Sequence, residues 1–265
     1  MFAWLKKKKA IPPRPGDVMK RVVVLKFLVV KARATPPPEY LAEIMKKWSE
    51  QERGEFIRDF QNLYGRVEQL RRIGLWGEME QRERDFMQSA PTAATQQSLL
   101  DITWLAESAV CLLWALGYVA ELPPYDQEAD PKEMKALPQQ TLKLLVENAT
   151  LLPADGIMKQ RNLAELWHWR SRTRQLQESG KTPDELPKGW TIDQIIQTVA
   201  TKAAENGSFP ALIGNDFPAL GKPYRELTPD EFSRLTSIAM ERHRAFNWLC
   251  GYAPGNNWAE TPTET

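Results

Sequence analysis

The chain of 265 residues contains few of the side chains, and none of the short motifs, on which the common enzyme classes depend. It has two cysteines and two histidines, and the patterns GxGxxG, GxxxxGKS/T, GxSxG and HExxH are all missing. Nucleotide-binding folds, serine hydrolases and zinc peptidases therefore have no support. Cys111 and Cys250 lack the CxxC spacing, so we expect reduced, buried thiols in a cytoplasmic protein, although the sequence alone also allows a disulfide between them.

The scarcity of histidine argues against a metal centre. A catalytic zinc site takes three protein ligands, and the chain offers only His168 and His243. Glu165 and His168 form one Glu-x-x-His pattern, whereas a di-iron carboxylate bundle uses two such patterns and two further glutamates. We therefore expect no metal and no cofactor.

An apolar run that could cross a bilayer is also missing near the start of the chain. The run from Val22 to Val30 is interrupted by Lys26 and is too short, so no transmembrane segment is expected. At the N-terminus five mainly apolar residues precede Lys6 to Lys9, which is the reverse of the order in a signal peptide. The chain is accordingly expected to stay in the cytoplasm.

The net charge of +1 hides an uneven distribution of charge along the chain. Residues 1–35 contain ten Lys or Arg side chains and one acidic side chain, Asp17, so the remainder is acidic. We expect residues 1–16 to form a flexible basic tail that docks on an acidic body, and residues 17–265 to form a single domain. Non-specific binding to nucleic acid and contact of the tail with an anionic membrane surface are weaker alternatives, because few aromatic residues accompany the lysines.

No alternating strand pattern and no repeat is present, whereas helical spacing recurs along the whole chain. The capping signals and breakers predict these helices: 18–34 with Asp17 as N-cap, 39–48, 49–74 with a Ser49/Glu52 capping box, 79–88, 91–117, 131–150, 153–179, 191–206 and 228–250. Residues 207–227 are predicted to form an ordered loop that packs through its aromatic side chains. The fold expected is all-α, an irregular bundle of about eight to ten helices around a buried central helix.

The central helix is predicted over Ile102 to Ala120, where the chain is apolar on almost every face. Glu107 is its only charged residue before Glu121. A buried carboxylate needs a cation or a proton, so a basic partner from another helix is expected. Arg242 fits this role, because it occupies the one vacant position of the apolar seam of the last helix.

Arg170 and Arg174 share one face of the helix predicted at 153–179, beside Trp167. We expect one cluster of charged residues walled by indole rings, on which the guanidinium groups stack. Its members are Glu107, Arg170, Arg174, Glu241 and Arg242, and its walls are Trp104, Trp114, Trp167 and Trp248. The favoured interpretation is an ion-pair network that fixes how three helices dock; an anion-binding site and a catalytic site are the alternatives.

Three segments have a more distinctive composition than the rest: 103–126 (TWLAESAVCLLWALGYVAELPPYD), 163–175 (LAELWHWRSRTRQ) and 241–265 (ERHRAFNWLCGYAPGNNWAETPTET). Together they resemble domain-of-unknown-function family 4272, a bacterial helical family, over most of residues 18–265. The resemblance implies that Tyr252 and Trp258 fold back onto the bundle, with Asn256 or Asn257 in a turn. The resemblance implies no activity. Relatives carry an acidic residue where this chain has Ala259, which argues against a site that uses a carboxylate at this position.

Two classes of function remain open. A protein-binding or adaptor module, for example one that neutralises a partner, would use an exposed aromatic patch. An enzyme or small-anion-binding protein would present Glu107, the arginines and His243 or Cys250 in a cleft that solvent reaches. Since no catalytic motif occurs, we expect a protein-binding module without catalysis.

Overall fold

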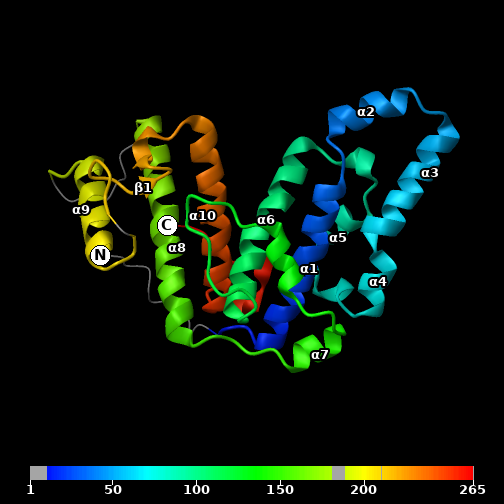
Figure 1. The fold of residues 1–265 in the computed structure, drawn as a ribbon, viewed down its shortest axis with the longest axis horizontal. Helices are drawn as coiled ribbons and strands as arrows, with labels where there is room; N and C mark the ends of the chain where they lie inside the picture. Colours follow the sequence, from blue (N-terminus) through cyan, green and yellow to red (C-terminus); the bar gives the residue numbers. More distant parts are fainter. Residues whose placement is uncertain (1–10, 181–188, 210, 265) are drawn as a thin grey trace.

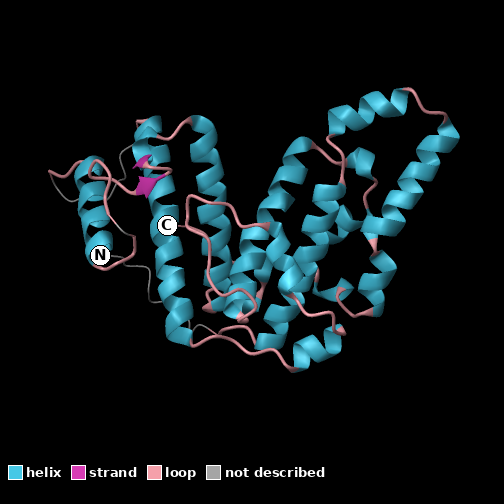
Figure 2. Ribbon diagram, viewed as in Figure 1, coloured by secondary structure: helices cyan, strands magenta, loops and turns pink. Residues whose placement is uncertain are grey.

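The computed structural model describes residues 11–180, 189–209 and 211–264. Within these ranges it has ten α-helices, several short 3-10 or π turns and one hairpin of two-residue strands. Figures 1 and 2 show that helices account for nearly all of the regular structure. The all-α fold class expected from the sequence is confirmed. Residues 1–10, on which most of the predicted basic tail falls, lie outside the described residues.

The centre of the bundle is α6 (Gln96–Ala115), as predicted. It packs between α1 (Pro15–Ala34) and α10 (Pro229–Leu249), while α8 (Ala154–Ser179) covers the other side of α10. These four helices lie side by side in the order α1, α6, α10, α8 in Figure 1. By length and composition α6 could also cross a membrane, but 61% of its apolar window is buried inside the fold, as in the core helix of a globular protein.

The valine-rich segment at the start of the chain is helical despite its strand propensity. Val18, Val22, Leu25 and Val29 are fully buried on α1, so packing against α6 outweighs the local preference for a strand. The predicted cap is wrong, because the helix begins at Pro15 and Asp17 lies in its first turn.

Two predicted helices are interrupted. The helix expected over 49–74 begins with the predicted capping box but divides into α3 (Glu50–Phe60), the π turn η1 (Gln61–Gly65) and α4 (Val67–Arg72), with Arg66 left-handed at φ 47°. The Gln61 amide nitrogen donates to the carbonyls of Gln88 (2.7 Å) and Ser89, which holds this turn against the end of α5 (Gln81–Gln88). A π turn widens the helix where such a tertiary contact is made.

The helix expected over 131–150 is the second interrupted one. It consists of a 3-10 turn, η4 (Pro131–Ala136), and a short helix, α7 (Leu142–Glu147). Leu137 is extended at φ −61° and ψ 125° because Pro138 follows it, and a residue before proline avoids the helical region. The helix expected from 91 is also shorter: Pro91–Ala93 form the 3-10 turn η3, and α6 starts after its N-cap Thr95.

The remaining elements agree with the prediction within a few residues. They are α2 (Pro38–Lys46), α5, α8, α9 (Ile192–Glu205) and α10, which begins with the expected Thr228 capping box. The described part of the loop after α9 contains the hairpin of β1 (Pro218–Ala219) and β2 (Lys222–Pro223). Its Phe209, Phe217 and Tyr224 rings are buried and surround Trp167 of α8 at 5.4 to 6.2 Å between centroids.

The C-terminal tail folds back onto the bundle as the family resemblance implied. Trp258 is buried, with its ring edge-on to Trp248 at 5.2 Å, and it lies between the guanidinium groups of Arg21 and Arg244. Asn256 adopts the left-handed conformation at φ 59°, and the side-chain oxygen of Asn257 accepts a hydrogen bond from the backbone of Ala259. Both asparagines therefore shape the turn.

Candidate functional site

The predicted pairing of Glu107 with Arg242 is present. Arg242 Nε donates to Glu107 Oε2 at 2.8 Å, and the two side chains are 1% and 2% exposed. The other carboxylate oxygen accepts a hydrogen bond from the backbone nitrogen of Ala129 at 2.7 Å. Burial raises the pKa of Glu107, and the Arg242 guanidinium opposes that rise.

The remaining guanidinium hydrogens of Arg242 bind the loop between α6 and η4. Its Nη atoms donate to the carbonyls of Pro123, Pro124 and Gln127 at 2.6 to 3.1 Å, and the group lies over the Tyr125 ring. Tyr125 in turn stacks on Trp167, with centroids 5.5 Å apart and rings nearly parallel. Arg242 thus ties a proline-rich loop to α6 and α10, and solvent does not reach the pair.

The predicted single cluster does not form, because Arg170 has another partner. Arg170 Nε and Nη2 each donate to one carboxylate oxygen of Asp216 at 2.7 Å, in a fully buried bidentate pair. Asp216 also accepts from the backbone nitrogens of Phe217 and Arg225. Burial alone would raise the pKa of Asp216, but Arg170 and these two amides together hold it below its ordinary value.

Arg174 and Glu241 are also separate from Glu107. Arg174 donates to the carbonyls of Tyr224 (2.9 Å) and Leu227 (2.8 Å). Glu241 accepts from Ser108 at 2.7 Å. The expectation that the arginines stack on indoles is wrong as well: Arg174 lies over Phe232 and Arg170 over Tyr224.

The four predicted tryptophan walls have different neighbours. Trp167 stacks on Tyr125, which itself lies against Arg242, so Trp167 does not contact the guanidinium through this stack. Trp114 packs edge-on against Phe246 at 5.8 Å, and Trp248 packs edge-on against Trp258. Trp104 is half-buried against the core. The helical periodicity identified which residues point inward but not which neighbour each one meets.

A pair of histidines is another polar contact that the sequence did not predict. His168 on α8 and His243 on α10 are both buried, and their Nδ1 atoms are 3.1 Å apart. Asn247 Nδ2 lies 2.9 Å from the Nε2 atom of His243. Burial lowers the pKa of His168 to about 4, and the nearby Arg172 adds to this effect. The pKa of His243 is lowered to about 3 by burial, by His168 and by Arg161. The only signal in the sequence was that both histidines fall on inward-facing helix positions.

The cysteines are not part of a catalytic pair. Both thiols are free and buried, and burial raises the pKa of Cys111 and takes that of Cys250 to about 11. Among the described residues no group of three His, Cys, Asp or Glu side chains could hold a metal ion. Glu165, the candidate beside His168, is bound to Arg161 at 2.6 Å.

A small pocket of about 200 Å³ opens beside the buried Arg170–Asp216 pair. Its lining residues are Arg170, Gln177, Asp193, Ile196, Gln197, Gly214, Asn215, Asp216 and Arg225. Gln177 receives a weak 3.4 Å hydrogen bond from Arg170 and donates to Asp193 at 2.6 Å. Two positive and two negative side chains therefore face this pocket.

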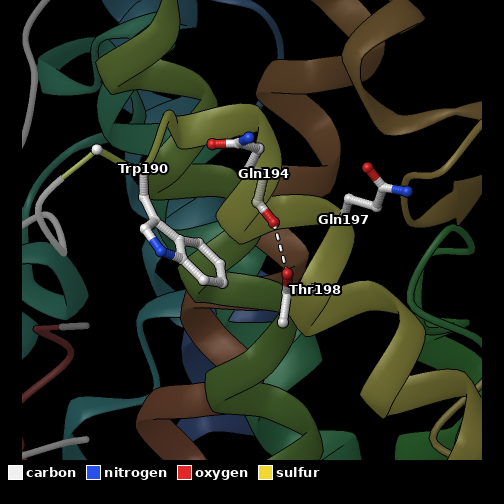
Figure 3. Close-up of a pocket in the computed structure, with 5 residues that line it drawn as sticks. Trp190, Gln194, Gln197 and Thr198 are labelled. Carbon is white, nitrogen blue, oxygen red and sulfur yellow. Dashed lines mark hydrogen bonds between the residues drawn. The ribbon is translucent and has the colours of Figure 1, made fainter.

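A second pocket, of about 410 Å³, lies at the start of α9 beside Trp190, whose surface is 45% exposed. Figure 3 shows the Trp190 indole and the Thr198 side chain on one side of the helix, with Gln197 pointing away from them. Gln197 lines both pockets. Among the residues that the structure describes, those that line the Trp190 pocket offer hydrogen bonds, and none of them is ionisable.

Comparison with known proteins places the chain in a family. The model of a family described as "Domain of unknown function (DUF4272)" matches residues 5–192, which is more than half of the chain. The chain belongs to the DUF4272 family. No curated protein and no solved structure matches it.

The DUF4272 match covers α1 to the start of α9 and therefore includes Glu107, Arg170 and Arg174. It ends before Asp216, His243 and the C-terminal tail. The partners of Arg170 and of Glu107 thus both lie beyond the matched region, and the resemblance noted for residues 241–265 stays an expectation.

Proposed function

We propose that this DUF4272 protein is a cytoplasmic protein-binding module without catalytic activity, and that it binds its partner through an arm. The arm consists of α2, α3 and η1, residues 38–65. Figure 1 shows α2 and α3 standing away from the four central helices. The observation that carries the proposal is that this arm has large exposed side chains and an aromatic cluster of its own.

The aromatic cluster of the arm is separate from the main core. Trp48, Phe56, Phe60 and Tyr64 follow one another with ring centroids 4.9 to 6.0 Å apart, and none of them belongs to the main hydrophobic cluster. The chief contacts of α3 are with η1, and those of α2 with η3. The cluster stiffens the arm, while η1 and α2 connect the arm to the rest of the molecule through α1, α5 and η3.

Exposed apolar side chains on the arm supply the binding surface. Tyr40 on α2 is 60% exposed and Leu63 on η1 is 57% exposed. Tyrosine is enriched among the residues that dominate binding energy at protein interfaces, because its large ring loses little conformational entropy on binding. A partner with an apolar groove fits this surface.

The buried charges support the absence of catalysis. In the two buried ion pairs the charged groups form their hydrogen bonds with other groups of the protein; the members are Glu107, Arg170, Arg242 and Asp216. General acid or base chemistry needs a titratable group within reach of a substrate. These pairs instead dock helices and loops, which is the usual role of such networks.

Site-specific photo-crosslinking in the native host tests the proposal. A benzophenone amino acid at position 40 or 63 should crosslink one discrete protein, whereas the same group at Leu144 or Met158, exposed on α7 and α8, should not. The double variant Tyr40→Glu/Leu63→Glu should lose the partner in a pull-down with an unchanged Tm, while Leu144→Glu keeps it. Equal crosslinking at all four positions, or none on the arm, contradicts the proposal.

Binding of a small anion in the Arg170 pocket is the second candidate. Within the described residues the Arg225 guanidinium donates to one protein acceptor, the Gly214 carbonyl at 2.7 Å, so its other two nitrogens can donate hydrogen bonds to a bound anion. Titration calorimetry with inorganic phosphate should show binding that Arg225→Gln weakens about tenfold and that Arg234→Gln, on exposed α10 surface, leaves unchanged. The absence of heat with the wild-type protein rules this candidate out.

A further inference from the structure

The end of the C-terminal tail is held by one side-chain amide. Asn247 Nδ2 donates to the carbonyl of Pro262 at 2.7 Å, whereas Trp258, four residues earlier, is held between Arg21 and Arg244. Asn247 is on α10, one turn beyond His243. The last residues of the tail and the buried histidine pair therefore share one contact.

The orientation of this amide fixes the protons of the histidine pair. Asn247 Oδ1 accepts from Arg161 Nε at 2.8 Å, and a guanidinium group can only donate. The amide nitrogen must therefore face His243, so His243 Nε2 is an acceptor and its Nδ1 carries the hydrogen. That hydrogen is donated to His168 Nδ1 across 3.1 Å.

An additional proton has only one place to go. While the two Nδ1 atoms share one hydrogen and His168 Nε2 carries its own, the remaining nitrogen of the pair is His243 Nε2, whose lone pair accepts from the Asn247 amide. A hydrogen there would point at the hydrogens of the Asn247 amide. Turning the amide over to accept it would set its nitrogen against Arg161 and its oxygen against the Pro262 carbonyl.

The charges around the pair do not offset such a proton. On α8, Arg161 and Arg172 are cations near the rings, and Glu165 is bound to Arg161. On α6, Glu107 is bound to Arg242, and Cys111 is a neutral buried thiol. On α10, the charged residues that flank His243 in sequence already have partners: Glu241 is bound to Ser108, and Arg244 lies near Glu80 and Glu241. On the tail, Glu260 and Glu264 are exposed.

We propose that His168, His243 and Asn247 form a proton-sensitive latch that releases residues 259–264 when the histidine pair takes up a proton. Protonation breaks the Asn247–Pro262 hydrogen bond and the Asn247–Arg161 hydrogen bond together. Trp258 stays in place, because its contacts with Arg21, Arg244 and Trp248 involve no group that changes charge in this range. Mild acid thus frees the tail end and leaves the helices folded.

The direction of the pH effect follows from the neutral pair. In the latched state burial, His168 and Arg161 lower the pKa of His243 to about 3, and on release the amide no longer blocks Nε2, so the pKa of His243 rises toward its ordinary value of about 6.5. The latch is therefore fully stable above about pH 6.5 and weakens as the pH falls below it. One proton taken up on release changes the opening constant about tenfold per pH unit.

Hydrogen exchange, corrected for the intrinsic rate, measures the latch from pH 7 to pH 5. Amides in 259–264 should lose protection about tenfold per pH unit below about pH 6.5, while amides of α6 stay protected. In His243→Gln the Gln oxygen still accepts from Asn247 and its nitrogen still donates to His168, so the acid response should disappear. His168→Gln keeps a titratable His243 and should keep the response.

Three results overturn the proposal. They are protection of 259–264 that does not depend on pH, an acid response in His243→Gln equal to that of the wild type, and loss of α6 protection at the same pH as the tail. If His243→Gln does not fold, Asn247→Ala serves instead. It should expose 259–264 already at pH 7 with no further change in acid, and a tail that stays protected in this variant contradicts the latch.

Discussion

At the scale of single residues, Arg242 is the side chain on which most local structure depends. It neutralises Glu107 and gives hydrogen bonds to three backbone carbonyls, so one guanidinium satisfies a buried carboxylate and three carbonyls of the neighbouring loop. Removing one partner of a buried ion pair leaves the other charge without compensation. The loop through Pro123 to Gln127 would lose its donors at the same time.

We therefore predict that Arg242→Met lowers the free energy of unfolding by about 3–5 kcal/mol, measured by urea denaturation at pH 7. Arg234→Met on the same helix is the matched control, because Arg234 is 43% exposed and its contact with Glu128 is 3.6 Å long. It should change stability by less than about 0.5 kcal/mol. A loss below about 1 kcal/mol for Arg242→Met would show that the pair contributes little.

The sequence predicted this pair because each member interrupts an otherwise apolar helix face. It did not predict the pairing of Arg170, since Asp216 lies in a loop with no periodicity from which its direction could be inferred. The contact between His168 and His243 was missed for a related reason. It depends on how α8 and α10 are aligned along their axes, which helical spacing does not determine.

At the scale of elements, local capping signals predicted where helices begin better than where they are interrupted. Ser49, Thr191 and Thr228 each form a capping box at the expected start. The break at Arg66 depends on the tertiary contact of Gln61 with the end of α5, which no local pattern records. The two-residue hairpin strands are too short to produce an alternating pattern.

The turn after α10 gives a prediction at this scale. Gly251 has φ +78°, and a Cβ atom there would lie 2.5 Å from the backbone carbon of Ile11 and 2.7 Å from Pro12 N. Gly207, after α9, has φ +70° with nothing within 4 Å. Gly207→Ala should cost about 1–2 kcal/mol of stability for the left-handed conformation alone.

Gly251→Ala should cost about 1–3 kcal/mol more than Gly207→Ala, because the backbone at 11–12 must also move. Urea denaturation of the two variants separates conformational strain from crowding. Equal losses would mean that residues 11–12 adjust without cost.

At the scale of the whole molecule, the fold consists of a large core and an arm that contacts the rest of the molecule at its two ends, through α2 to η3 and through η1 to α1 and α5. The main hydrophobic cluster runs from Val18 to Trp258 and includes residues of α1, α6, α8 and α10, but none from α2 or α3. The arm is connected near Lys31 of α1. The Lys31 ammonium donates to the carbonyls of Phe86, Met87 and Ser89 at 2.7 to 2.9 Å, beside Gln61.

This arrangement predicts two levels of stability within one chain. Amides of α3 should exchange hydrogen through local opening of the arm, with a free energy below that of α6 and α10, whose amides open only with the core. Lys31→Met removes the donor for three carbonyls at the arm's base, one buried and two part-buried, so it should speed exchange in α3 at least about tenfold. Lys20→Met, on the exposed part of the same helix, should not.

Native-state hydrogen exchange followed by mass spectrometry measures all of these segments in one experiment. If α3 has the same opening free energy as α6, the arm and core unfold as one unit, and the surface proposed for partner binding is fixed rather than independently mobile. If Lys31→Met destabilises α3 and α6 equally, Lys31 supports the core rather than the arm. Only a selective loss of protection in α3 identifies Lys31 as the anchor of the arm, because a contact that stabilises one cooperative unit changes the opening of that unit alone.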